Sequence, residues 1–260
     1  MIMEMIKSVI ASKPIWLWGL TFSLLWLILA VFVFSQSVPK TYALYFSSIV
    51  VSALIVWVFT NIISNISTNL IMSSTSLYYA FKFTKLTPQR YLLYYIISIS
   101  IVTILMSSIV LIFSIVFFTI QFKTLLLPPN VLGFLGVIIL SSIFVITFSI
   151  FLALLLPPKY IQLSSLLPQV LYFILVLGQI FIGYPYLFTY TSPFNDMQLL
   201  LFQQYSGYPP PLSFINPYSS TLNTNFLLTS ILSWDSGLYI IDVSLLRRVK
   251  VRSIDEMRQF

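Results

Sequence analysis

The stretch Ser76–Arg90, SLYYAFKFTKLTPQR, separates two long apolar runs and so decides how the chain is divided. It carries two lysines and an arginine without one acidic residue, and a Thr-Pro pair lies near its end. The flanking runs, at about residues 44–63 and 91–120, are each long enough to cross a bilayer of about 30 Å. The stretch is therefore expected to be a basic, aromatic segment held at a membrane surface between two spans.

The composition indicates an integral membrane protein. The 260 residues are 59% hydrophobic and only 7% charged, whereas a soluble domain carries about 25% charged residues. Cysteine and histidine are both absent, which excludes disulfides and thiolate chemistry and argues against haem, copper and zinc sites. The net charge of +7 is attributed to membrane topology and anionic lipid rather than to nucleic acid.

The predicted architecture is an all-α membrane protein with one transmembrane domain. A signal peptide is the alternative for the first apolar run, but that run is longer than the roughly 7–15 residues of a signal-peptide core. Each predicted span has about the 20 apolar residues that a bilayer requires. The six predicted spans are residues 15–34, 44–63, 91–120, 131–156, 164–183 and 226–246.

Two segments outside the spans have their own predicted structure. Residues 1–13 place apolar side chains at helical spacing, with Glu4 and Lys7 on the other face, and this pattern predicts an amphipathic helix in the membrane interface. Residues 184–225 are rich in Tyr, Pro, Ser and Asn with one charge, Asp196. We expect short re-entrant or interfacial helices there, because a long loop in a compact protein is usually functional or partly folded.

Charge asymmetry predicts the topology. With six spans, eleven of the thirteen Lys and Arg residues lie on one side and only Lys40 and Lys123 on the other. The positive-inside rule then places both termini in the cytoplasm of a multi-pass plasma-membrane protein. Residues 68–90 become a cytoplasmic segment, residues 247–260 a cytoplasmic tail, and residues 184–225 an outer segment.

Asp235 and Asp242 are the only carboxylates inside a predicted span. Seven residues apart, they share one helical face. They are interpreted either as part of a path for a cation or substrate, or as structural acids, Asp235 near the outer interface and Asp242 near the inner one. The second interpretation is favoured. The chain has no P-loop motif and no H-E-x-x-H or G-x-S-x-G motif, so it does not bind ATP through a P-loop of its own.

Taken together, this layout resembles the type-2 ABC transporter permease family. The similar motifs are Ser76-Leu77 and Thr87-Pro88-Gln89-Arg90 after the second span, and Asn216-Pro217-Tyr218 in the last outer loop. Lys82 stands near the place where the family usually has a glutamate. The resemblance implies a permease subunit of an ATP-driven exporter that is not itself an enzyme and binds no cofactor. ATP and Mg²⁺ would be bound by a separate ATP-binding cassette subunit.

The resemblance also implies partners and a contact site. Two permease copies, as a homodimer or a related heterodimer, would pair among membrane lipids, without nucleic acid, and move a hydrophobic or amphiphilic substrate. The segment around Leu77–Phe83 would be a coupling helix that docks on the ATP-binding subunit. Its expected contact residues are Leu77, Tyr78, Tyr79, Phe81, Lys82, Lys85, Thr87, Pro88 and Arg90.

Two other functions remain open from the sequence. One is a membrane-embedded structural or accessory subunit of a larger complex, without transport of its own. The other is a membrane enzyme that uses Asp235 and Asp242.

Overall fold

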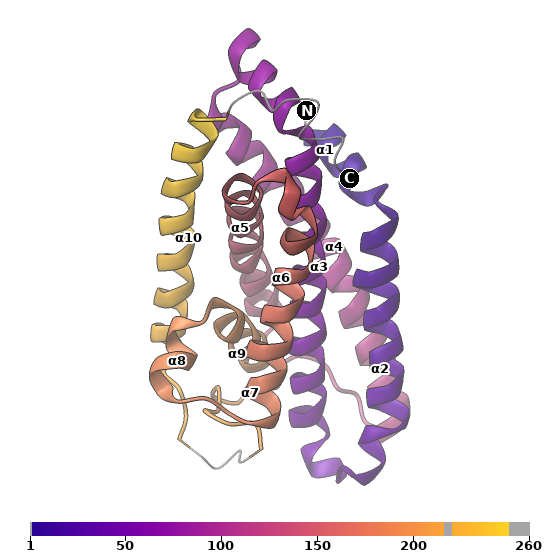
Figure 1. Cartoon of the computed structure of the whole chain (residues 1–260). Coiled ribbons are helices and arrows are strands. Elements are labelled where there is room, and N and C mark those ends of the chain that lie inside the picture. The colour runs from indigo at the N-terminus through magenta and orange to yellow at the C-terminus, as the bar shows by residue number, and fades with distance from the viewer. Residues whose placement is uncertain (1, 216–219, 250–260) are drawn as a thin grey trace.

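One helix of 41 residues, α3 (Ala43–Phe83), runs the length of the molecule and organises the bundle around it (Figure 1). At 1.5 Å per residue it is about 61 Å long, roughly twice the hydrocarbon thickness of a bilayer. The computed structural model describes residues 2–215 and 220–249. The Asn216-Pro217-Tyr218 motif and most of the predicted tail lie outside these residues.

Six helical segments of the described chain are long and apolar enough to span a membrane. This confirms the prediction of a helical multi-span membrane protein, and no strand occurs among the described residues. The segments are Ile15–Ser37, which contains η1 (Ile15–Thr21), α2 (Phe22–Phe32) and η2 (Phe34–Ser37); Lys40–Phe83, with η3 (Lys40–Tyr42) and α3; α4 (Pro88–Phe122); α5 (Val131–Leu155); Ile161–Phe181, with α6 (Ile161–Leu171), η5 (Tyr172–Leu177) and α7 (Gly178–Phe181); and α10 (Thr224–Arg247).

α3 is the core of the bundle because it packs against helices from four other spans: η1 and α2, α4, α5 and α6. Its buried face carries many small hydroxyl residues, which allow helix backbones to approach closely in a membrane. Two of them also bond across to α6. The Ser64 hydroxyl donates to the Ser165 carbonyl at 2.7 Å, and the Ser67 hydroxyl to the Ser164 carbonyl at 3.2 Å.

The helix of the second span extends well beyond residue 63, where the apolar run ends. Residues 64–75 are rich in Ser, Thr and Asn, which lower the hydropathy without breaking the helix. Their side chains bond to backbone carbonyls of the preceding turn, as Thr68 does to Ser64 at 2.7 Å and Ser73 to Asn69 at 2.8 Å. The expected cytoplasmic segment therefore begins as an uninterrupted continuation of α3.

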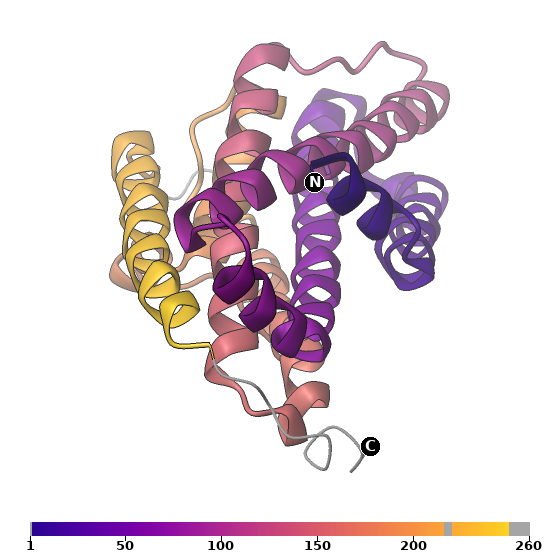
Figure 2. The same ribbon diagram turned by 90° about the horizontal axis from the view of Figure 1, so that it is seen from above.

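The two ends of the bundle differ in character. We call the end that carries the α3–α4 turn the turn end; α1 (Ile2–Ile10) and the C-terminal end of α10 lie there too (Figure 1). α1 packs against α4 near this end (Figure 2). A 3-10 turn, η4 (Pro158–Tyr160), connects α5 to α6.

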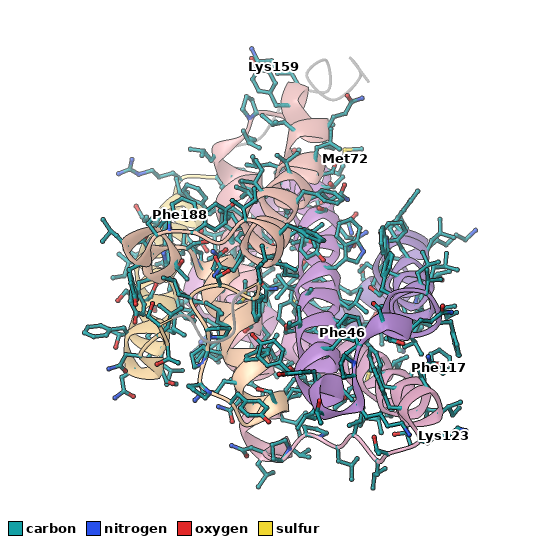
Figure 3. The ribbon with its side chains drawn as sticks, turned by 90° about the horizontal axis from the view of Figure 1, so that it is seen from below. Phe46, Met72, Phe117, Lys123, Lys159 and Phe188 are labelled. Carbon is teal, nitrogen blue, oxygen red and sulfur yellow. The ribbon has the colours of Figure 1, made fainter. Side chains whose placement is uncertain are left out.

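At the opposite end, residues 184–215 form two short helices. α8 (Tyr186–Thr191) contacts α10, while α9 (Pro193–Ser206) contacts α3, α5 and α10. Twelve of the fourteen α9 residues are buried, so this helix is an internal part of the bundle. Seen from this end, Phe188 of α8 and Phe117 of α4 lie at opposite edges of the molecule (Figure 3).

Polar side chains of α9 fix it to its neighbours. Asn130 caps α5 by accepting from the Gly133 amide at 2.9 Å, and its Nδ2 donates to Gln204 Oε1 at 2.6 Å. The Thr224 hydroxyl at the start of α10 donates to Gln203 Oε1 at 2.9 Å. The bonds to Gln204 and Gln203 therefore join α9 to the starts of α5 and α10.

Candidate functional site

The turn between α3 and α4 is built by two threonines and a proline. Thr84 follows the last residue of α3, and its hydroxyl donates to the Ala80 carbonyl at 2.6 Å and accepts from the Leu86 amide at 3.1 Å. Thr87 caps α4 by accepting from the Arg90 amide at 3.3 Å. Pro88 occupies the first helical position, where its missing N–H costs nothing. The predicted residues Thr87 and Pro88 thus shape the turn.

Two predicted contact residues face the protein rather than the solvent. Leu77 is buried, with 9% of its surface exposed. Phe81 is half-buried, and its ring packs edge-on against Tyr91 of α4 with centroids 5.6 Å apart. Tyr91 in turn stacks on Tyr95 at 5.5 Å. These rings hold the ends of α3 and α4 together, so we assign Leu77 and Phe81 to packing of the turn.

The exposed face of the turn carries an aromatic pair. The rings of Tyr79 and Phe83 stack with centroids 5.9 Å apart, and their exposed fractions are 48% and 71%. Tyr78 packs edge-on against Tyr79 at 5.5 Å. Phe83 was not among the expected contact residues, although its position four residues after Tyr79 places both on one helical face.

Cations surround this aromatic pair. Lys82 Nζ donates to the Tyr78 hydroxyl at 3.2 Å and lies 5.6 Å from the centre of the Phe83 ring, within cation–π range. Lys85 and Arg90 are exposed on the same turn. The structure therefore brings together Tyr78, Tyr79, Lys82 and Phe83, and this set together with Lys85 and Arg90 is called the turn surface below.

Asp235 and Asp242 lie on the buried stripe of α10, which also contains Leu227, Ile231, Leu238 and Leu246. Their exposed fractions are 6% and 0%, and no described group hydrogen-bonds to either carboxylate. The interpretation favoured from the sequence places Asp235 near the outer interface. In a helix that runs from Thr224 to Arg247, Asp235 is at the midpoint. It faces protein there because the stripe packs against α5 and α9.

Sequence reasoning did not assign a role to Asp196, a third buried carboxyl, in the first turn of α9. Burial raises the pKa of Asp196 to about 8, and the nearby Ser230 side chain of α10 lowers it to a smaller extent. Neither carboxylate oxygen of Asp196 has a hydrogen-bond partner among the described residues. Nearby in the chain, the Gln198 amide is also buried without a described hydrogen-bond partner. One feature of the sequence could have drawn attention to Asp196: it is the only charged residue between Lys159 and Asp235.

The acids do not form a metal centre. Among the described residues, no group of three or more Asp, Glu, His or Cys side chains could hold a metal ion. The two cavities described for this chain, one beside α3 and one beside Gly237 of α10, have no acidic residue in their linings. The turn surface exposes its side chains to solvent, whereas these acids are buried, and it is therefore the stronger functional candidate.

Comparison with known proteins adds no assignment, since no family model, curated protein or solved structure matches the chain.

Proposed function

We propose that this chain is the membrane-spanning permease subunit of an ATP-driven ABC exporter, and that the turn surface docks on a separate ATP-binding subunit. One observation carries the proposal: a helical hairpin extends beyond the rest of the bundle and presents aromatic and cationic side chains at its tip. The exporter class itself comes from the resemblance of the sequence. In this proposal both termini and the turn surface are cytoplasmic.

The reach of the hairpin supports docking. The last twenty residues of α3 follow its apolar run and would add about 30 Å to a helix that has already crossed the bilayer. In Figure 1 the C-terminal end of α3 stands clear of the other helices at the turn end. A loop that only fixed topology would not need this length.

The chemistry of the tip supports a protein partner. Tyr79 and Phe83 are large, rigid side chains exposed to solvent, the kind enriched at interface hot spots. The stacked pair needs little ordering on binding, because the two rings already contact each other. The cations around the pair favour a partner groove with an acidic rim, which would guide association.

The remaining parts of the proposal come from the resemblance to the permease family. A second permease copy and membrane lipids complete the assembly, and the substrate is hydrophobic or amphiphilic. ATP and Mg²⁺ belong to the partner subunit, so this chain hydrolyses nothing itself.

The docking is tested with the double variant Tyr79→Asp/Phe83→Asp in the full chain, tagged and purified from native membranes. Two carboxylates at a hydrophobic contact should reduce the bound ATP-binding subunit at least about tenfold, since hot-spot residues contribute about 2 kcal/mol or more each. Photolabelling with 8-azido-ATP and mass spectrometry measure the retained subunit.

Tyr160→Asp is the matched control, because Tyr160 is an exposed aromatic residue beside a lysine in the connection between α5 and α6. It should retain the ATP-binding subunit. Equal retention by the double variant and the control would reject the docking surface. Retention without nucleotide-dependent transport in vesicles would favour an accessory subunit instead.

A further inference from the structure

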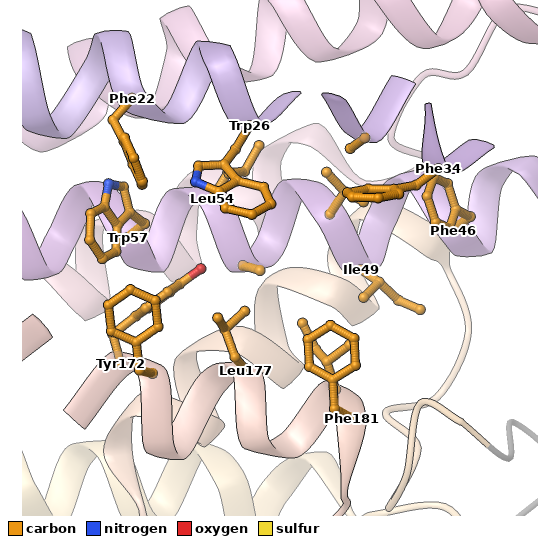
Figure 4. Close-up of a pocket in the computed structure, with 15 residues that line it drawn as sticks. Phe22, Trp26, Phe34, Phe46, Ile49, Leu54, Trp57, Tyr172, Leu177 and Phe181 are labelled. Carbon is orange, nitrogen blue, oxygen red and sulfur yellow. The ribbon is translucent and has the colours of Figure 1, made fainter. Parts of the chain in front are cut away.

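A cavity of about 360 Å³ lies between the first, second and fifth candidate spans (Figure 4). α3 forms its floor from Phe46 to Trp57, α2 forms one wall, and η5 with α7 forms the other. At one end Trp57 contacts Phe22 at 5.1 Å and Tyr172 at 5.0 Å between ring centroids, so aromatic rings close the cavity there. Phe34 and Phe46 lie at the other end (Figure 4). We call this cavity the groove.

The groove is almost entirely apolar. Its lining contains aliphatic and phenylalanine side chains, and its polar atoms are limited to the Tyr172 hydroxyl and the indole nitrogens of Trp26 and Trp57. The Trp57 indole already donates to the Trp18 carbonyl at 3.0 Å. All the elements that form the groove belong to three candidate membrane spans. An occupant must therefore be a hydrocarbon that enters sideways from the bilayer.

The length of the groove matches one leaflet. Phe46 and Trp57 are eleven residues apart on a continuous helix, which corresponds to about 17 Å. The hydrocarbon layer of a bilayer is about 30 Å thick, so the groove covers about half of it. It begins near the first turn of α3, at the end opposite the α3–α4 turn. A single acyl chain of that leaflet has the matching extent and shape.

The cation closest in the chain to this end of the groove indicates which head group it would accept. Lys40 lies in the short connection between Phe34 and Phe46, two residues that line the groove, and its side chain is exposed. The sequence contains no acidic residue between Glu4 and Asp196, so no neighbour in the first three spans neutralises this lysine. A phosphate head group would meet it at the membrane surface.

We propose that the groove binds one acyl chain of an anionic membrane phospholipid, drawn from the leaflet on the side of Lys40, with the phosphate head group at Lys40. The proposal goes beyond the exporter function, because it requires neither an ATP-binding subunit nor transport. A tightly held lipid would fill the gap between the first and fifth spans and the central helix.

The test uses the full chain in detergent, with dioleoyl phosphatidylglycerol and dioleoyl phosphatidylcholine as probes and native mass spectrometry as the readout. The wild-type chain should retain one phosphatidylglycerol and bind it several-fold more tightly than phosphatidylcholine. Ala53→Phe places a ring in the floor of the groove and should weaken phosphatidylglycerol binding at least tenfold. Ala30→Phe fills the groove from the α2 wall and takes the place of Ala53→Phe in this test if Ala53→Phe does not fold.

Two further variants separate specific from general effects. Ile112→Phe adds the same ring to an exposed position of α4 outside the groove, and its lipid binding should remain at the wild-type level. Lys40→Gln should retain a lipid but lose the preference for phosphatidylglycerol. Unchanged lipid binding in both folded alanine variants would overturn the proposal. If the alanine variants lose a dimer but keep the lipid, the groove is a contact site for a second copy of the chain and the proposal is overturned. If Lys40→Gln still prefers phosphatidylglycerol to phosphatidylcholine, the contact between Lys40 and the head group is overturned.

Discussion

Asp196 shows how a single residue can make the stability of this protein depend on pH. It lies in the first turn of α9, where the helix dipole favours a negative charge, yet none of its surface is exposed. The loss of solvation on burial outweighs the helix dipole and raises the pKa of Asp196 to about 8. The folded state therefore binds this proton more tightly than the unfolded state, in which an aspartate titrates near pH 3.9.

The sign of the effect follows from this difference in pKa. This contribution to stability is fully present below the unfolded pKa and is lost as the pH rises from about 4 through about 8, because over this range the unfolded state has released the proton while the folded state keeps it. We predict that the thermal midpoint of the wild-type chain in detergent falls by several degrees between pH 5 and pH 9, and that Asp196→Asn reduces this fall. Intrinsic tryptophan fluorescence during heating measures both midpoints.

Glu4→Gln is the control, because Glu4 is an exposed acid and its removal should leave the pH dependence unchanged. Parallel pH curves for the wild type and Asp196→Asn would contradict the assignment.

At the residue scale, the sequence reveals the chemistry of the turn surface but not the orientation of its side chains. The aromatic and basic character of residues 76–90 is plain from the letters, and Tyr79 and Lys82 are indeed exposed. Whether Leu77 or Phe83 faces outward depends on the side from which α4 packs. That contact is made by Tyr91, eight residues beyond Phe83, and no local pattern reveals it.

At the scale of elements, α10 combines an apolar stripe with two carboxylates. Asp235 occupies a position on this stripe where its neighbours are Ile231 and Leu238. A buried polar group without hydrogen bonds costs about 1–3 kcal/mol by the measure of protein variants. The helix folds despite this cost because the rest of the stripe is apolar and packs on α5 and α9.

We predict that Asp235→Leu raises the free energy of unfolding by about 1–3 kcal/mol, because it replaces an unpaired buried carboxyl with an apolar side chain of similar size. The thermal midpoint in detergent should rise accordingly. Ser236→Leu, at the exposed neighbouring position, should change it little. A lower midpoint for Asp235→Leu than for the control would mean that the carboxyl is bonded in the folded protein and has a role there.

The spans themselves could be predicted from hydropathy, but the boundaries of α3 and the burial of α9 could not. Hydropathy ends the second span near Ile63, whereas the helix continues through Asn65 and Asn69, whose side chains bond to each other at 2.9 Å. For α9, the run Met197–Phe202 is too short to cross a membrane. Its burial depends on contacts with three distant helices, so composition alone predicts only a short helix.

At the scale of the whole molecule, six spans place alternate connections at opposite ends. The natural absence of cysteine makes this directly testable, since any single cysteine introduced is the only one. We predict that Ser8→Cys and Thr84→Cys in oriented vesicles react with a membrane-impermeant maleimide from one side, and that Ser37→Cys and Tyr208→Cys react from the other. All four positions are exposed.

Mass-shift labelling before and after permeabilisation measures the sidedness, and labelling in detergent confirms that every thiol is reactive. Reaction of Thr84→Cys and Ser37→Cys from the same side would overturn the six-span arrangement and, with it, the docking of a cytoplasmic subunit at the turn surface.

The 41 residues from Ala43 to Phe83 contain neither glycine nor proline, the usual sites of a helix kink. This makes α3 a stiff rod that carries the turn surface at its C-terminal end and forms the floor of the groove near its N-terminal end. Without a kink site between Phe83 and Phe46, a sideways displacement of one end tilts the whole helix. If the turn surface docks on a partner as proposed, movement of that partner would change the shape of the groove at the other end of the same helix.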